Sequence, residues 1–249
     1  MSTTTPLTFP ATLISSLRSA QSITVLTGAG ISAESGIPTF RDSQTGLWAQ
    51  YDPHELATPQ AFERNPGLVL EWYRWRRSLV EQSSPNLAHY ALVEIERRTP
   101  RFTLITQNVD GLHRSAGSQN VIELHGNIHQ LRCAQEDTLV DPWPADALPH
   151  CTICGSLLRP NVVWFGESLP PSALQAARDA TLHCEIFLSI GTSGMVEPAA
   201  SLAYEALRSK AVVIEINPTP TPLTVYVPYH FPLPAGQVLP ALVQAVWPG

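Results

Sequence analysis

Five short runs of apolar, largely β-branched residues recur along the chain, with room for a helix between most of them. They span residues 23–26, 101–106, 121–124, 185–190 and 212–216. Such runs are typical of strands that are buried on both faces of a parallel sheet. Amphipathic stretches alternate with them, at residues 13–20, 86–98, 172–182, 198–209 and 238–246. This alternation predicts an α/β fold, a doubly wound parallel sheet with helices on both faces.

Two stretches interrupt the alternation. Residues 43–84 predict a helical insertion, with one or two helices over 56–82 that are broken at Pro59 and Pro66. Residues 126–160 hold three of the four cysteines among several prolines and glycines, and predict a small inserted cysteine module with too few residues for its own core. The length of 249 residues suits one domain over 1–249 that carries both insertions.

The stretch from Thr27 to Arg41 follows the first predicted strand. Gly28, Gly30 and Ala33 match the pattern G-x-G-x-x-G/A. In that pattern the first glycine forms a tight turn, the second lets the backbone approach a pyrophosphate, and the third small residue lets a helix pack on the strand. The backbone N–H groups at the start of that helix attract the anion. An ordinary turn between a strand and a helix is the alternative.

Polar residues follow the next two predicted strands. Gln107, Asn108 and Asp110 come after residues 101–106, and His125 comes after residues 121–124. Ligands of open parallel sheets bind at the carboxyl ends of the strands. The first three side chains offer paired donors and acceptors to a ribose and a carboxamide, although Asn and Asp also stabilise plain turns. Histidine titrates near neutrality, so His125 suits a general base unless it is a structural residue.

The charge pattern argues against some partners. The formal net charge is −6 and no basic run stands out, which argues against a nucleic-acid partner held by phosphate contacts. No apolar run approaches the length of a membrane span, and the first residues lack the layout of a signal peptide. We therefore expect no membrane partner and a cytoplasmic location.

Six motifs in order along the chain resemble those of the sirtuins, the NAD-dependent protein deacylases. They are GAGISAESGIPTFR at 28–41, QNVD at 107–110, HG at 125–126, VVWFGE at 162–167, GTS at 191–193 and EINP at 215–218. The resemblance implies a Rossmann-like sheet with a zinc-ribbon-like module, NAD as the cofactor, and acylated-lysine proteins or peptides as substrates.

The resemblance also implies roles for individual residues. His125 and Asn108 would be catalytic, and NAD would contact Gly28, Ala29, Gly30, Ser32, Ala33, Thr39, Phe40, Arg41, Trp48, Gln107, Asn108, Asp110, Gly191, Thr192, Ser193, Asn217 and Ala235. Two segments would hold the peptide as an added strand, through Val163, Phe165, Gly166, Glu167, Met195 and Val196. Plain loop packing around Trp164 and Phe165 is the alternative for these segments.

Tyr73 and Arg76 are three residues apart on a predicted helix, so they share a face. A phenol hydroxyl and a guanidinium fork together make a good carboxylate receptor. The pair resembles the Tyr-x-x-Arg signature of class III sirtuins, which remove succinyl, malonyl and glutaryl groups from lysine. Because Arg74 and Arg77 lie beside Arg76, an exposed basic patch is the alternative.

The cysteines depart from the two Cys-x-x-Cys pairs with which sirtuins usually hold a structural zinc. Cys151 and Cys154 form an intact second pair, but Cys133 is followed by Glu136 where a cysteine is expected. Because carboxylate and imidazole groups also bind zinc, the fourth ligand could be Glu136, Asp137 or His150. A weakened or empty site is the alternative.

The resemblance predicts NAD-dependent removal of succinyl and malonyl groups, and more weakly of acetyl groups, from lysine. It implies that the acyl oxygen attacks the ribose carbon of NAD and displaces nicotinamide. His125 then deprotonates a ribose hydroxyl, and water releases lysine and O-acyl-ADP-ribose. An ADP-ribosyltransferase, a nicotinamide dehydrogenase and a non-catalytic NAD sensor or scaffold are the rival functions, and a monomer is expected.

Overall fold

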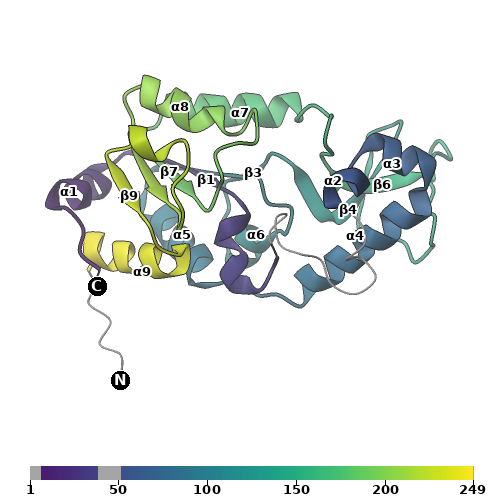
Figure 1. The fold of residues 1–249 in the computed structure, drawn as a ribbon, viewed down its shortest axis with the longest axis horizontal. Helices are drawn as coiled ribbons and strands as arrows, with labels where there is room; N and C mark the ends of the chain where they lie inside the picture. The colour runs from purple at the N-terminus through teal and green to yellow at the C-terminus, as the bar shows by residue number, and fades with distance from the viewer. Residues whose placement is uncertain (1–6, 39–51, 249) are drawn as a thin grey trace.

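The computed structural model describes residues 7–38 and 52–248, which form a larger and a smaller lobe (Figure 1). The larger lobe is built on a six-stranded sheet in the order β3-β2-β1-β7-β8-β9, with parallel pairing throughout. Its strands are β1 (Ser22–Thr27), β2 (Arg101–Thr106), β3 (Val121–Glu123), β7 (Ile186–Ile190), β8 (Val212–Ile216) and β9 (Tyr229–Phe231). All five predicted strands are present, and the edge strand β9 was not predicted.

The order of these strands fixes where a ligand would bind. The chain runs outward from β1 through β2 to β3, then returns to the other side of β1 for β7, β8 and β9. The side on which successive strands are added therefore reverses between β1 and β7, although the two strands are parallel. Because the loops that leave neighbouring strands on either side of such a reversal diverge, a crevice opens at the carboxyl ends of β1 and β7.

Helices cover both faces of the larger sheet, as the predicted α/β fold requires. On one face lie α1 (Ala11–Ser19), α5 (Leu87–Arg98) and α9 (Ala235–Val246), which share one apolar core with the sheet. On the other face lie α7 (Pro171–Leu182) and α8 (Ser201–Arg208), in a second core. Figure 1 shows the two layers on opposite sides of the strands. The doubly wound prediction is confirmed.

The smaller lobe combines helices and strands that are far apart in the sequence. Its helices are α2 (Pro53–Leu56), α3 (Pro59–Arg64) and α4 (Pro66–Glu81). Its strands are β4 (Gly126–Cys133), β5 (Leu139–Val140) and β6 (Leu158–Val162), which form an antiparallel sheet in the order β5-β4-β6. The short helix α6 (Leu112–Ala116) follows β2 in the larger lobe.

The helical insertion is interrupted at Pro59 and at Pro66, as predicted, and each proline begins a new helix. Pro59 is the first residue of α3 and Pro66 is the first residue of α4, where the missing N–H has no intrahelical partner to lose. The preceding residues cap these helices, since the Thr58 hydroxyl accepts from the N–H of Ala61 and the Asn65 side chain accepts from that of Leu68, each at 3.1 Å.

One apolar core joins the helices of the smaller lobe to its sheet. Its buried aromatic members are Phe62, Trp72, Tyr73, Trp143 and Trp164. Neither the helices nor the small sheet has enough apolar residues to form a core alone, so the two stretches stabilise each other. In the described parts of the chain, no helix is both long and apolar enough to span a membrane.

Candidate active site

The glycine loop packs directly against the loop that leaves β7. The N–H of Gly28 donates to the carbonyl of Ile190 at 3.0 Å, and the N–H of Gly30 donates to that of Gly191 at 2.8 Å. A Cβ on Gly28 would lie 2.8 Å from the Gly191 oxygen, and one on Gly30 would lie 2.7 Å from the Gly191 Cα. The glycines are therefore required by backbone contact across the switch point of the sheet, in addition to any approach of a phosphate.

The segment after Gly28 is not the α-helix that the glycine pattern suggested. It forms two short 3₁₀ turns, Ala29–Ile31 and Ala33–Ser35. The side chain of Asn86, the N-cap of α5, donates to the carbonyl of Ile31 at 2.7 Å and to the hydroxyl of Ser35 at 3.0 Å. Tertiary hydrogen bonds thus hold the turns in place, and the anion site cannot be ascribed to a helix dipole.

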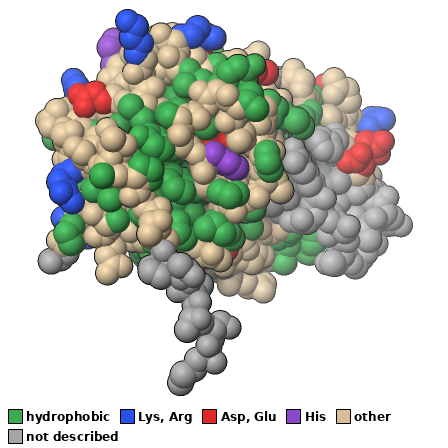
Figure 2. Space-filling view, turned by 60° about the vertical axis from the view of Figure 1, so that its left-hand side comes forward, with side chains coloured by type: hydrophobic (Ala, Val, Ile, Leu, Met, Phe, Trp, Pro, Cys, Tyr) green, Lys and Arg blue, Asp and Glu red, His purple; other side chains and the backbone are tan. Residues whose placement is uncertain are grey.

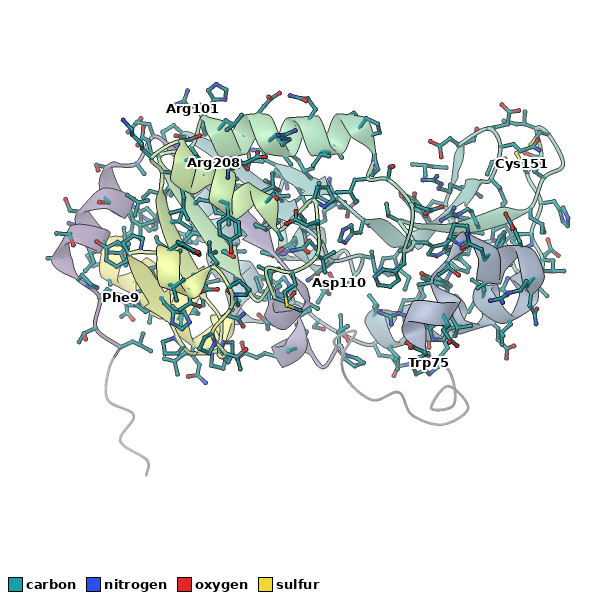
Figure 3. All side chains as sticks on the ribbon, turned by 45° about the horizontal axis from the view of Figure 1, so that its top comes forward. Phe9, Trp75, Arg101, Asp110, Cys151 and Arg208 are labelled. Carbon is teal, nitrogen blue, oxygen red and sulfur yellow. The ribbon has the colours of Figure 1, made fainter. Side chains whose placement is uncertain are left out.

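Three predicted side chains form a buried network beside the glycine loop. Ser32 donates to a carboxylate oxygen of Asp110 at 2.8 Å, and the amide of Asn108 lies 3.2 Å from both the Gly28 carbonyl and the Ser32 hydroxyl. Burial raises the pKa of Asp110, against the effect of hydrogen bonds from Leu112 and Ser32. The network joins the loops after β1 and β2 and fixes the orientation of Asn108. In Figure 3 Asp110 lies where the two lobes meet.

A second set of predicted residues joins the loops after β2, β7 and β8. The amide of Gln107 donates to the hydroxyl of Thr192 at 2.9 Å, and the amide of Asn217 donates to the carbonyl of Thr192 at 2.9 Å. Thr192 is thus held from both sides, with the half-buried Ser193 next to it. The structure brings these polar residues together at one edge of the sheet, as the strand-end argument requires.

His125 lies between β3 and β4 with a defined tautomer. Its Nδ1 lies 2.9 Å from the carbonyl oxygen of Gln107, which can only accept, so Nδ1 carries the proton. The neutral ring then has a lone pair at Nε2. Burial lowers the pKa of His125, against the smaller effect of the Gln107 hydrogen bond, so the ring is largely neutral at pH 7. A neutral, oriented imidazole is what a general base requires.

Ala235 is the buried first residue of α9, and the helix start beside it is already occupied. The N–H of Gly236 donates to the carboxylate of Glu34 at 2.7 Å. A carboxylate at a helix N-terminus is stabilised by the unpaired N–H groups there. Glu34, which the sequence did not single out, therefore ties α9 to the glycine loop. The predicted NAD contacts of Thr39, Phe40, Arg41 and Trp48 lie outside the described residues.

The two segments expected to hold a peptide expose apolar side chains. Phe165 is 42% exposed, Met195 is 64% exposed and Val196 is 44% exposed. The backbone of the first segment is anchored, because the N–H of Val163 donates to the carbonyl of His125 at 2.9 Å. The open space around Gly166, at φ +89°, leaves the turn accessible. Exposed apolar side chains on anchored backbone fit the recognition of an extended peptide.

Glu167 has another role in the structure. Its two carboxylate oxygens accept from the guanidinium of Arg159 at 2.5 and 2.9 Å, and one of them also accepts from the N–H of Trp164 at 2.8 Å. Glu167 therefore closes its own turn and leaves little capacity for direct contact with a peptide. Arg159 was missed in the sequence, although an arginine between Leu157-Leu158 and Val162-Val163-Trp164 was a signal that it has a buried partner.

Tyr73 and Arg76 share the inner face of α4. Tyr73 is buried, and burial raises the pKa of its hydroxyl to about 12, so the phenol keeps its proton. The half-buried Arg76 lies over the ring of Trp72, with Cζ 5.0 Å from the ring centroid. Burial lowers the pKa of Arg76 and the neighbouring Tyr73 raises it. The guanidinium remains charged, because arginine titrates far above neutral pH.

The neighbouring arginines point to other partners. Arg74 donates to the carbonyls of Asp146 and Ala147 at 2.6 and 3.1 Å, and Arg77 pairs with Glu81 at 2.9 Å. Both also lie over the ring of Trp143 instead of Trp72. The three arginines therefore do not form the single basic patch that was the alternative for Arg76.

The three predicted cysteine ligands meet at the outer end of the smaller lobe, where Figure 3 labels Cys151. The sulfur atoms of Cys133, Cys151 and Cys154 lie within 4.8 Å of one another. Among the described residues, Glu136, Asp137 and His150 do not join this group of candidate ligands. Asp137 instead pairs with Arg132 at 3.2 Å. The described residues thus supply three zinc ligands and leave the fourth open.

The two cysteine turns resemble each other in detail. The Sγ of Cys133 accepts from the N–H groups of Gln135 and Glu136 at 3.4 and 3.3 Å, and the Sγ of Cys151 accepts from that of Ile153 at 3.4 Å. Such hydrogen bonds favour the thiolate that binds a metal. Three thiols on two such turns fit zinc, and the backbone N–H of Glu136 bonds to one of them.

Two histidines that the sequence analysis did not assign to the site lie buried behind it. His89 and His113 pack with ring centroids 4.8 Å apart, and the Nε2 of His113 lies 2.9 Å from the hydroxyl of Thr27. Burial lowers the pKa of His89 to about 4 and that of His113 to about 3. Both are therefore neutral in the folded protein at pH 7.

The surface of the larger lobe offers no basic stripe on the face that Figure 2 shows. Apolar side chains spread over that face, and Lys and Arg appear only as isolated groups near its outline. The face shown therefore lacks the row of basic side chains that typically contacts nucleic-acid phosphates.

Comparison with known proteins assigns the chain to a family. The model of the Sir2 family matches residues 28–198. The chain belongs to the Sir2 family. The chain is 53% identical to an NAD-dependent protein deacylase of Aquifex aeolicus over 84% of this chain and 88% of that relative. It is 46% identical to one of Methylococcus capsulatus, over 96% of this chain and 97% of the relative.

Solved structures agree with the family assignment. The structure of a Sir2 homologue in complex with NAD matches with a TM-score of 0.90 and 46% identity, over 96% of this chain and 94% of that one. Another, of Sir2 bound to an acetylated peptide, matches with a TM-score of 0.82 and 30% identity, over 94% of this chain and 96% of that one. The sirtuin resemblance inferred from the six motifs is confirmed.

Proposed function

We propose that this chain, an NAD-dependent protein deacylase of the Sir2 family, removes succinyl and malonyl groups from lysine in preference to acetyl groups. The observation that carries the preference is the placement of Tyr73 and Arg76. The phenol of Tyr73 receives a hydrogen bond from the indole of Trp164 at 2.9 Å. Trp164 belongs to the segment proposed to bind the peptide, so an acyl-lysine held there would extend toward Tyr73 and Arg76.

The charge of the site favours an acidic acyl group. A carboxylate at the end of a succinyl or malonyl chain would accept from the Tyr73 hydroxyl and the Arg76 guanidinium. A charge-assisted hydrogen bond in a site with little water contributes roughly 1.5–3 kcal/mol, which corresponds to about tenfold to a hundredfold in catalytic efficiency. An acetyl group offers no carboxylate and would gain nothing from these two side chains.

The larger lobe supplies the chemistry that is common to all acyl groups. NAD, when bound, supplies the ribose carbon that accepts the acyl oxygen as nicotinamide leaves. Gln107 orients the ring of His125 through its carbonyl, and the free Nε2 of His125 takes a proton from a ribose hydroxyl. Asn108 and Asp110 are held in place by Ser32. The amide nitrogen of Asn108 is used on Ser32 and on the Gly28 carbonyl, so its side-chain oxygen is the group left to accept a hydrogen bond. Closure of this crevice against water protects the reactive ribose.

We propose a structural zinc in the smaller lobe, held by Cys133, Cys151 and Cys154. The grouping of the three sulfur atoms supports this site. Hydrogen bonds from Ser156 lower the pKa of Cys154 to about 7, which favours its thiolate form. The zinc would tie the turn after β4 to the turn before β6, far from the crevice. Its role is therefore stability of the smaller lobe and not the acyl transfer itself.

The deciding experiment compares succinyl-, malonyl- and acetyl-lysine peptides by mass spectrometry, with and without NAD. Arg76→Met should lower desuccinylation by about tenfold to a hundredfold and deacetylation far less, for the reason given above. Arg77→Met is the matched control, since Arg77 pairs with Glu81 and lies over Trp143. If Arg76→Met slows all acyl substrates equally, the acyl preference is wrong. ADP-ribosylated protein in place of O-acyl-ADP-ribose would overturn the deacylase assignment.

A further inference from the structure

Trp164 determines which way the hydroxyl of Tyr73 can act. An indole N–H is a donor and never an acceptor, so the 2.9 Å contact between Trp164 Nε1 and the Tyr73 oxygen has only one polarity. The phenol oxygen accepts from the indole. Its own proton therefore remains for another partner, and the described residues offer it no acceptor. The raised pKa of Tyr73, caused by burial, keeps that proton in place.

The side chain of Trp164 contacts a cation and a second aromatic ring, and its backbone is also hydrogen-bonded. The guanidinium of Arg159 lies over the ring with Cζ 3.5 Å from the centroid, and the ring of Phe62 packs at 5.3 Å. The guanidinium of Arg159 and the backbone N–H of Trp164 both donate to the carboxylate of Glu167. Three contacts thus fix the ring, and Trp164 is only 3% exposed. The indole N–H is therefore held in its hydrogen bond with Tyr73.

We propose that Trp164 is a positioning residue for recognition of the acyl carboxylate. Its indole N–H occupies an acceptor position of the Tyr73 phenol oxygen, so that the hydroxyl proton is directed away from the indole and toward the acyl group. This inference rests on the proposed function, because it assigns Trp164 a part in the same acyl preference.

The physical basis is preorganisation of a donor. A free phenol rotates about its C–O bond and can accept from Arg76, in which case its proton points away from the guanidinium. With the indole in place, Tyr73 and Arg76 both present donors to one carboxylate, and no rearrangement is needed when it binds. Loss of one orienting neutral hydrogen bond corresponds to roughly threefold to tenfold in affinity.

The test removes the N–H and keeps the ring. Trp164→Phe should raise KM for a succinyl-lysine peptide roughly threefold to tenfold more than KM for the acetyl-lysine peptide of the same sequence. Replacement of Trp164 by 3-benzothienylalanine, which has sulfur in place of the N–H, gives the same test if the phenylalanine variant folds poorly. Equal effects on both peptides, or no effect on either, would overturn the proposal.

Trp143→Phe is the matched control for the loss of an indole. Trp143 is also buried in the core of the smaller lobe, and its N–H has no partner among the described residues. Trp143→Phe should change the KM values for the succinyl and acetyl peptides by the same factor. A preferential effect on the succinyl peptide would show that general loosening of the core is sufficient, and would count against Trp164.

Tyr73→Phe completes a double-mutant cycle. If the indole acts through the phenol, Trp164→Phe should have no further effect on the succinyl-to-acetyl ratio once Tyr73 is phenylalanine. Additive effects would contradict the proposal. The Arg76→Met variant separates the two hypotheses, since an unchanged acyl ratio there removes the proposed preference itself. A changed ratio with Arg76→Met and Tyr73→Phe, but not with Trp164→Phe, would remove only the role of Trp164.

Discussion

The two lobes hold their functional side chains by different means. In the larger lobe, short polar side chains at the strand ends bond to one another and to backbone carbonyls, as Ser32 does with Asp110 and Asn217 with Thr192. In the smaller lobe, long side chains stack on aromatic rings, as Arg159 does on Trp164 and Arg76 on Trp72. Short hydrogen-bonded groups give precise placement, whereas stacked cations and rings give a shaped surface that recognises charge.

The difference suggests a division of labour. The larger lobe would hold NAD and His125, which act on every acyl group alike. The smaller lobe would sense what the acyl group carries at its far end, through Tyr73 and Arg76. Changes in the larger lobe should therefore lower all deacylation equally, and changes in the smaller lobe should alter the ratio between substrates or its own stability.

The largest expected effect is that of His125→Ala. Removal of a general base typically costs a hundredfold to ten-thousandfold, so turnover of succinyl and acetyl peptides should fall together by about that factor. Binding of NAD, measured by calorimetry, should persist because the Ser32 and Asn108 network is intact. His183→Ala, at an exposed histidine whose ring nitrogen bonds to the Asp179 carbonyl, is the control. Near wild-type turnover in His125→Ala would exclude it as the base.

As pH falls, the larger lobe should lose folding stability before the smaller one. The pKa values of buried His89 and His113 lie at about 4 and about 3 in the folded protein, below about 6.5 in the unfolded chain. The unfolded chain therefore binds more protons as pH falls below about 6.5, and folding stability declines down to the folded pKa values. Each histidine contributes up to about 1.4 kcal/mol per pH unit to that slope.

His113→Gln checks this source of acid sensitivity. The amide nitrogen of glutamine can still donate to Thr27, but it does not titrate. Urea unfolding between pH 6.5 and 4.5 should show a slope that is shallower by up to about 1.4 kcal/mol per pH unit than in the native sequence. An unchanged slope would mean that carboxylates, and not the histidine pair, govern the acid response. Hydrogen exchange would locate the early opening in one lobe.

The smallest effect on the acyl chemistry, expected to be none, is that of Glu136→Cys, whose effect is confined to the smaller lobe. Loss of a residue that hydrogen-bonds to a metal ligand lowers metal affinity about tenfold to a hundredfold. A fourth thiolate that binds zinc directly should therefore raise zinc affinity by about tenfold or more. Competition with a coloured chelator measures this, and Glu136→Ser is the control. The acyl ratio should not change, because the thiols lie at the far end of the lobe from the crevice (Figure 3). Equal zinc affinities of the Glu136→Cys and Glu136→Ser variants would show that residue 136 does not face the metal.

Much of the larger lobe was predictable because its strands are local signals. The apolar runs of β2 and β8 match the predicted strands residue for residue. The edge strand β9 was missed, because Tyr229–Phe231 is a short segment among prolines that becomes a strand only by pairing with β8. The interruptions at Pro59 and Pro66 were predicted, but the sequence alone did not show that each proline is the first residue of the next helix.

The candidate site was predictable in its membership but not in its connections. The sequence by itself determined that a glycine loop, Asn108 and His125 follow apolar strands, because strand direction places all their carboxyl ends at one edge of the sheet. Only the tertiary structure decided that Gly28 and Gly30 are required by contact with Gly191, and that Trp164 bonds to Tyr73, 91 residues away. The physical reason is that apolar periodicity acts within one element, whereas the polarity of a hydrogen bond depends on which elements the fold brings together.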